Sequence, residues 1–140
     1  MEQRLSLVTL GVRDIAKARK FYEALGWKTG GPTNPHVAFF QLGGVIIGLW
    51  SKESLAEEAG LNLGKDFGGV ALAQNVADKK TVDRVLAEAE KAGGKIIAAA
   101  SDKFWGGYSG YFTDIDGHPW EIAWNPGFTL TADGKTLLEG

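Results

Sequence analysis

The chain has 140 residues, 44% of them hydrophobic, which suits one compact domain with a sizeable core. Its formal net charge is -2 and it has no Lys/Arg run, so we expect neither nucleic acid nor an anionic membrane surface as a partner. Without cysteine there is no disulfide, thiolate nucleophile or Cys-ligated zinc. We expect a soluble cytoplasmic protein, because no signal-peptide pattern and no apolar run near the ~20 residues that span a bilayer is present.

The first half of the chain predicts a strand, a helix and further strands. Residues 5–12 have the composition of a strand, and Asp14 then caps a helix whose apolar residues keep helical spacing until Gly26 ends it. The strands expected next lie at about 27–29, 36–42 and 45–50. Gly43 and Gly44 separate the last two and form a two-residue connection of the kind that closes a hairpin.

The same order of elements then occurs again after a polar connector at 51–66 that contains about one helical turn. A strand at 69–76 precedes a helix with one apolar face, which ends at Gly93 and Gly94. The last predicted strands lie at about 95–100, 109–114 and 119–124, the final two joined across the sequence DIDGH. Because each copy would expose an apolar sheet face that a second copy can cover, we predict an α+β fold of two tandem βαβββ modules.

The two ends of this repeat resemble a known superfamily. The opening VTLGVRDIAKARKFYEALGW and the closing YFTDIDGHPWEIAWNP are similar to the vicinal oxygen chelate superfamily, which includes glyoxalases, bleomycin-resistance proteins and extradiol dioxygenases. The resemblance implies a single domain over 1–140 with a half-open, barrel-like sheet, a cavity between paired modules, and a homodimer. Its modules would lie at about 4–50 and 67–126, with a C-terminal tail at 127–140 whose Leu137-Leu138 pair could strap across a partner.

The resemblance also implies where a metal would bind. Metal-using members take ligands from the first and last strand of each module. Setting Val8 against Val70 and Trp50 against Trp124 puts these positions at Leu7, Ile47, Gly69 and Glu121. We expect all four around one cavity. Only Glu121 is a ligand type, and one carboxylate cannot hold a catalytic divalent ion, so we expect no cofactor. A divalent metal recruited through other ligands is the alternative.

The two histidines do not complete this site. His118 is three residues from Glu121, and strand geometry puts residues at odd separations on opposite faces. His36 lies on a distant strand, and we do not expect it in the pocket. We interpret Asp114, Asp116 and Gly117 as a turn, in which short acids accept backbone N–H bonds and glycine supplies a positive φ.

Glu121 and the aromatic residues are the candidate site. Glu121 interrupts an apolar strand, so it is either satisfied by neighbouring hydroxyls and amides or acts as an acceptor, a counter-charge or, as the one candidate catalytic residue, a general base. The glycine-rich loop FWGGYSG predicts a lid or wall over a flat molecule, with a dimer contact as the alternative. The candidate ligand-binding residues are Phe39, Trp50, Phe104, Trp105, Tyr108, Tyr111, Glu121 and Trp124.

Two functions remain open from the sequence. The first is a bleomycin-resistance-like homodimer that binds a small aromatic or cationic molecule by stacking and one acidic contact, without metal. The alternative is a lyase, isomerase or dioxygenase that uses a recruited divalent metal or Glu121 as a base.

Overall fold

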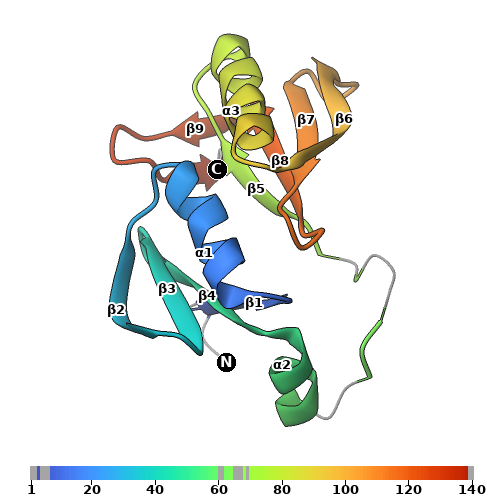
Figure 1. Ribbon diagram of the computed structural model, residues 1–140. Coiled ribbons are helices and arrows are strands. Elements are labelled where there is room, and N and C mark those ends of the chain that lie inside the picture. The colour runs from blue at the N-terminus through green and yellow to red at the C-terminus, as the bar shows by residue number, and fades with distance from the viewer. Residues whose placement is uncertain (1–2, 4–6, 60–61, 65–67, 69, 139–140) are drawn as a thin grey trace. The chain divides into compact units, whose positions relative to one another are not determined.

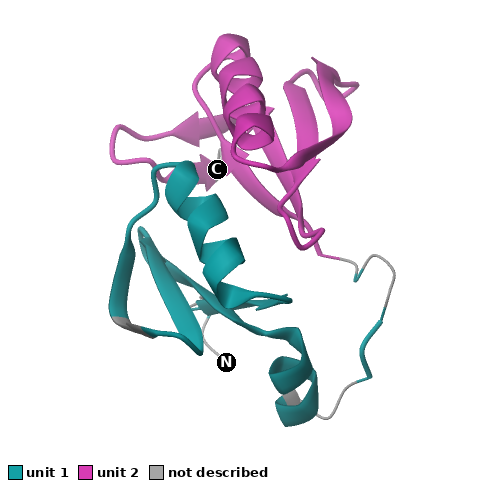
Figure 2. Ribbon diagram, in the orientation of Figure 1, with its two compact units in different colours: residues 1–68 teal, residues 69–140 magenta. Residues whose placement is uncertain are grey.

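The computed structural model describes residues 3, 7–59, 62–64, 68 and 70–138, apart from the side chains of 32, 33, 59 and 138. Its elements form two compact units, residues 1–68 and residues 69–140 (Figure 2). Each unit contains a four-stranded sheet built from one strand, a helix and three further strands, in that chain order (Figure 1). The predicted α+β fold with two βαβββ modules is therefore confirmed.

Unit 1 follows the predicted order of elements closely. They are β1 (Leu7–Val12), α1 (Ile15–Ala24), β2 (Thr29–Asn34), β3 (Val37–Leu42) and β4 (Val45–Ser51). The strand order is β1-β4-β3-β2, with β1 parallel to β4 and the other pairs antiparallel. Next comes α2 (Lys52–Ala59), an eight-residue helix where the sequence predicted about one turn.

Helix α1 begins and ends where its sequence predicts. The Asp14 side chain accepts the Lys17 backbone N–H at 3.0 Å, which satisfies one of the free donors of the first turn. Gly26 follows the helix with a φ of 91°, a conformation that suits glycine. Tyr22 is buried and its ring centroid lies 5.8 Å from that of Phe40, so this aromatic contact joins α1 to one face of the sheet.

Unit 2 repeats the arrangement. Its elements are β5 (Leu72–Asn75), α3 (Lys79–Lys91), β6 (Lys95–Asp102), β7 (Tyr108–Thr113) and β8 (Pro119–Trp124). The strand order is β5-β8-β7-β6, and β5 is parallel to β8 as β1 is to β4. No strand was predicted in the C-terminal tail, but it contains a further hairpin, in which β9 (Phe128–Leu130) pairs with β10 (Thr136–Leu138).

Helix α3 packs closely on the sheet of unit 2. Its apolar side chains Val82, Leu86 and Ala89 are buried. A Cβ added at Gly110 would lie 2.7 Å from the Leu86 Cδ1 atom, so the absence of a side chain there allows the helix to approach β7. Gly110 pairs with Ile122 on β8, and this shared row identifies the sheet face that α3 covers.

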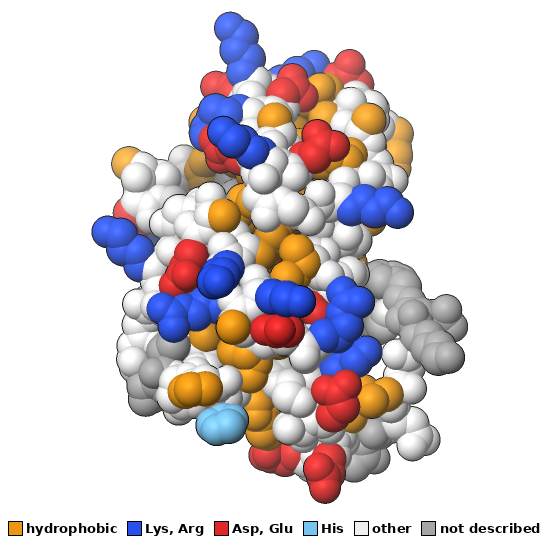
Figure 3. Space-filling view, viewed as in Figure 1, with side chains coloured by type: hydrophobic (Ala, Val, Ile, Leu, Met, Phe, Trp, Pro, Cys, Tyr) orange, Lys and Arg blue, Asp and Glu red, His pale blue; other side chains and the backbone are white. Residues whose placement is uncertain are grey.

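Acidic and basic side chains are interspersed over the face seen in Figure 3, and no large patch of one sign stands out. This agrees with the small net charge of the chain. Within the described ranges, no helix is long and apolar enough to cross a membrane.

Candidate functional site

Unit 1 has a hollow of about 470 Å³ on the sheet face opposite α1. A hollow of this size falls within the range of small-molecule sites. Gly48 forms its floor, where an added Cβ would lie 3.1 Å from the Phe39 Cε1 atom. The walls are formed mainly by the apolar side chains of Leu7, Val37, Phe39 and Trp50. The predicted ligand-binding residues Phe39 and Trp50 are thus brought together, on β3 and β4.

The remaining lining residues are polar and come from three segments. They are Thr9, Asn34 and His36. The Asn34 Oδ1 atom accepts the His36 backbone N–H at 2.8 Å, which fixes the turn between β2 and β3. His36, which the sequence did not place in the pocket of Glu121, therefore lines a hollow within unit 1. No pattern in the sequence indicates that the short turn between β2 and β3 brings an imidazole to the hollow.

The register of β4 corrects the predicted alignment of the two modules. Ile47 pairs with Phe40, whose ring contacts Tyr22 of α1, so Ile47 lies on the helix side of the sheet with 3% of its surface exposed. The prediction that Ile47 lines the cavity is wrong, whereas Leu7 does line the hollow. Gly69 lies outside the described residues. A one-residue shift in register moves every side chain to the other face, which accounts for the error.

Glu121 lies on the face of the unit 2 sheet that is turned away from α3. It alternates with Ile122, which shares the α3 face with Gly110, and it pairs directly with Tyr111 on β7. The Tyr111 hydroxyl donates a hydrogen bond to the Glu121 carboxylate. Burial, this hydrogen bond and the negative charge of Glu121 together raise the pKa of Tyr111 above its usual value. A phenol that stays protonated is a persistent donor to the carboxylate.

Ser109 adds a second hydroxyl to the same face. It lies two residues before Tyr111 on β7, and its side chain is fully buried. Its Oγ atom has no hydrogen-bond partner among the described residues. Sequence reasoning did not select Ser109, because one serine in a strand carries no distinguishing pattern.

Tyr108 and Trp124 lie on the opposite face from Glu121. They pair with each other, and the Tyr108 hydroxyl donates to Asp83 of α3 at 2.7 Å. The Lys79 ammonium of α3 lies 5.5 Å from the Tyr108 ring centroid and 5.8 Å from that of Trp124. These two aromatic residues thus connect α3 to the sheet and share no sheet face with Glu121.

Phe104 and Trp105 occupy a tight turn of five residues, 103–107, between β6 and β7. The Lys103 backbone N–H donates to the Gly107 carbonyl at 2.8 Å and closes the turn. Phe104 is fully exposed, whereas the Trp105 ring packs against Gly107, where a Cβ would lie 1.8 Å from a ring atom. The predicted lid is thus a short, hydrogen-bonded turn with one ring folded onto it.

The acidic turn has the structural role that the sequence suggested. The Asp114 side chain is nearly fully buried and its Oδ1 atom accepts the backbone N–H groups of Asp116 and His118, both at 2.9 Å. Its Oδ2 atom lies 2.7 Å from the His118 Nδ1 atom. Gly117 has a φ of 87°, as such a turn requires. His118 is thus held in this turn by Asp114.

The donor set does not fit a metal centre. In the part of the chain that the structure describes, no three His, Cys, Asp or Glu side chains are placed to share one ion. In unit 2, Glu121 of β8 pairs with Ala73 of β5. The equivalent pair in unit 1 is Gly48 of β4 with Thr9 of β1. After the alignment is corrected by one residue, the four equivalent positions are Thr9, Gly48, Ala73 and Glu121, and only Glu121 is a strong metal ligand. A divalent metal needs about three protein ligands.

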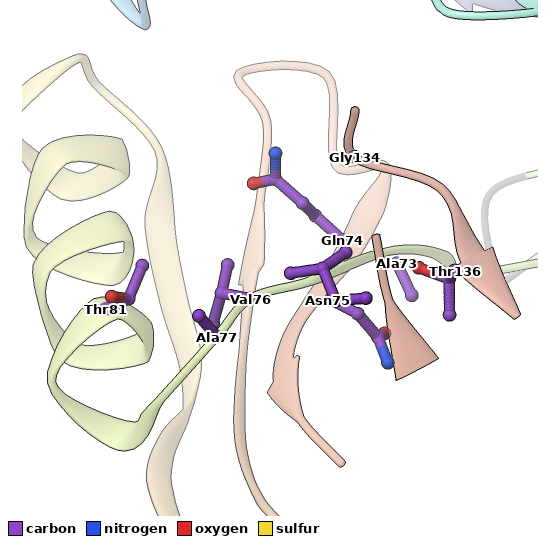
Figure 4. A pocket seen from close by; sticks show the side chains of 9 residues that line it. Ala73, Gln74, Asn75, Val76, Ala77, Thr81, Gly134 and Thr136 are labelled. Atoms are coloured by element: carbon purple, nitrogen blue, oxygen red, sulfur yellow. The ribbon is translucent and has the colours of Figure 1, made fainter. Parts of the chain in front are cut away.

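Unit 2 has a second hollow, of about 390 Å³, beside β5 and the C-terminal hairpin (Figure 4). The side chains that line it include Gln74 of β5, Thr81 of α3 and Thr136 of β10 (Figure 4). Its described lining residues include no aromatic or ionisable side chain. An adjoining hollow of about 510 Å³ in unit 2 is lined by the predicted site residue Trp124 and by Phe128, and its described lining residues include no ionisable side chain. We take the hollow of unit 1 as the candidate site, because it combines two aromatic walls with the imidazole of His36.

Comparison with known proteins agrees with this architecture. A glyoxalase-related enzyme from Fulvimarina pelagi has a similar structure, with a TM-score of 0.91 and 34% identity over 99% of this chain and 100% of that one. A glyoxalase/bleomycin resistance protein/dioxygenase family enzyme from Burkholderia phytofirmans PsJN has a TM-score of 0.72 and 24% identity over 84% of this chain and 95% of that one.

A lactoylglutathione lyase from Agrobacterium tumefaciens shares the fold, with a TM-score of 0.66 and 19% identity over 88% of this chain and 94% of that one. Among curated proteins, no sequence matches the chain significantly. The family model for the Glyoxalase/Bleomycin resistance protein/Dioxygenase superfamily matches residues 4–122. The chain belongs to this superfamily.

Proposed function

We propose that the protein binds a small, flat, aromatic molecule in the hollow of unit 1, without a metal cofactor. The observation that carries the proposal is the convergence of Phe39 and Trp50 on one apolar hollow of about 470 Å³. Aromatic pairs contribute about 0.5–1.5 kcal/mol beyond the apolar area that they bury, so two ring walls favour a planar ligand. Gly48 keeps the floor open for it.

The sequence also pointed to a cationic ligand through Glu121, and the site geometry makes this less favourable. Glu121 already accepts the Tyr111 hydroxyl, and it is not among the residues that line the hollow. The hollow itself is lined by no acidic residue within the described segments. The aromatic part of the proposal therefore has more support than the cationic part.

An enzyme is the second candidate, for two reasons. The similar protein from Fulvimarina pelagi is described as an enzyme. In addition, the Glu121 carboxylate, which accepts a hydrogen bond from the Tyr111 hydroxyl, is the one candidate general base that the sequence offers. A lyase, isomerase or dioxygenase with a recruited metal would need ligands beyond Glu121.

We also propose that the protein is a cytoplasmic homodimer. The absence of cysteine suits a reducing compartment. Leu137 on β10 is half exposed, as are Phe128 and Leu130 on β9, so this hairpin carries apolar side chains that a second copy could cover. Sedimentation at micromolar concentration should give a mass near twice 15.0 kDa.

The experiment is a binding screen with matched aromatic variants. A library of flat aromatic compounds is tested by thermal shift, with and without EDTA, and hits are titrated by calorimetry. Phe39→Ala should weaken a hit by roughly tenfold or more, because a ring wall is lost. Phe104→Ala is the control, since that ring is fully exposed on unit 2. Binding that EDTA abolishes and a divalent metal restores would contradict the metal-free proposal and favour the enzyme.

A further inference from the structure

The polar side chains that line the hollow of unit 1 can all donate hydrogen bonds, and none of them is a carboxylate. Thr9, Asn34 and His36 are the polar side chains that line it, and their hydroxyl, amide NH₂ and ring N–H groups can each donate a hydrogen bond. No Asp or Glu side chain is among the described lining residues. A ligand that enters this hollow therefore meets donors and no negative charge.

Asn34 is oriented by its own backbone contacts. Its Oδ1 atom accepts the His36 backbone N–H at 2.8 Å, so the acceptor end of this amide is already used. The other end is the NH₂ group, which carries two donors. Asn34 and the His36 ring thus both have donors to offer a ligand that occupies the hollow.

We propose that the hollow takes a flat apolar molecule that ends in a carboxylate or carbonyl group, and that it discriminates against the same molecule with a cationic end. This inference rests on the proposed function and adds the ligand class. The ring system packs between Phe39 and Trp50, and the acceptor oxygens face Asn34 and His36. An ammonium in this position would lose water without gaining a charged acceptor, and only the aromatic faces would offset that loss.

The test uses three probes that share one ring system: 2-naphthoate, 2-naphthamide and 2-naphthylmethylammonium. Calorimetric titration of the full chain should rank them in that order. Because hydrogen bonds to a charged acceptor are stronger than neutral ones, naphthoate should bind at least about tenfold more tightly than the ammonium.

Two variants test whether the rim sets this order. Asn34→Asp keeps the oxygen that accepts the His36 backbone N–H but replaces the donor group with a charged oxygen, so the ratio of naphthoate to ammonium affinity should fall by about tenfold or more. Asn62→Asp is the matched control on an exposed residue and should leave the ratio unchanged. His36→Ala should weaken naphthoate by roughly tenfold and the ammonium far less.

The outcomes separate this inference from the proposed function. If the ammonium binds the wild type as tightly as naphthoate, the ligand class is wrong although the hollow still binds aromatic molecules. If the wild type ranks the probes as expected but neither variant changes the ratio, the assignment to Asn34 and His36 is wrong. If no probe binds saturably, the proposed function fails and the inference fails with it.

Discussion

The contact between Tyr111 and Glu121 should stabilise unit 2 by a measurable amount. Tyr111→Phe removes only the hydroxyl that donates to the carboxylate, and it leaves the ring in place. A hydrogen bond to a charged group contributes about 1.5–3 kcal/mol when buried. Both side chains are partly exposed, so water can replace the lost donor, and we expect the free energy of unfolding to fall by about 1 kcal/mol.

Urea unfolding of Tyr111→Phe, Glu121→Gln and the double variant measures this contact. For a chain of this size, about 1 kcal/mol corresponds to a fall in Tm of roughly 3 °C. The double-mutant cycle should give a coupling energy of up to about 1 kcal/mol, because Tyr111→Phe removes the donor and Glu121→Gln replaces the charged acceptor with a weaker neutral one. A coupling energy near zero would refute the contact, and Glu121 would then need another explanation.

The effect should also depend on pH in a defined direction. Burial, the hydrogen bond and the charge of Glu121 raise the pKa of Tyr111, so the folded state holds the phenol proton more tightly than the unfolded state. The stabilisation is therefore complete below the unfolded tyrosine pKa of about 10 and is lost as the pH rises through the folded pKa. The difference between wild type and Tyr111→Phe should be constant from about pH 7 to 9 and shrink above about pH 10. A difference that grows above pH 10 would contradict the reasoning.

Three further changes test other features of unit 2. Gly107→Ala should destabilise the protein by about 1–3 kcal/mol in chemical unfolding, because its Cβ would lie 2.4 Å from the Trp124 carbonyl oxygen, which cannot move easily. Asp114→Ala should cost about 2–4 kcal/mol in the same assay, since a nearly buried carboxylate that accepts three hydrogen bonds is lost, whereas Asp114→Asn should cost less. Asp83→Asn should lower the pKa of Tyr108 measured by NMR titration, because the hydrogen bond to Asp83 is the largest cause of its raised value, followed by burial and the charges of Asp83 and Asp102.

The sequence predicted the elements well because their local signals are strong. Asp14 caps α1 as expected, and the predicted two-residue turn at Gly43 and Gly44 joins β3 and β4, with Leu42 opposite Val45. The turn at Asp114 also matched its interpretation, since short acids and glycine specify such a turn by their own hydrogen bonds and φ angles.

The sheet faces could not be predicted in the same way. In β4 the residues Ile47, Gly48 and Leu49 are all buried, so alternation does not show which of them faces α1. Trp50 and Trp124 were placed in equivalent positions, but Trp50 lines the hollow and Trp124 lies on the α3 side. The helix contact decides the face, and that contact is a property of the folded unit.

The candidate site was predicted in part for a related reason. Phe39 and Trp50 were expected to share a ligand site and do share the hollow, whereas Phe104 and Trp105 form a tight turn in unit 2. His36 was missed because its position depends on how β2 and β3 are joined, where Asn34 fixes the turn. Such a contact has no periodic signal in the sequence.

Mapping by NMR of ¹⁵N-labelled protein with 2-naphthoate tests the central claim most directly. If the hollow of unit 1 is the binding site, the largest shift changes on titration should occur at the backbone amides of Phe39, Gly48 and Trp50, and they should saturate together. Shift changes confined to Ala73, Tyr111 and Glu121 would contradict the claim and would place the ligand on the sheet of unit 2.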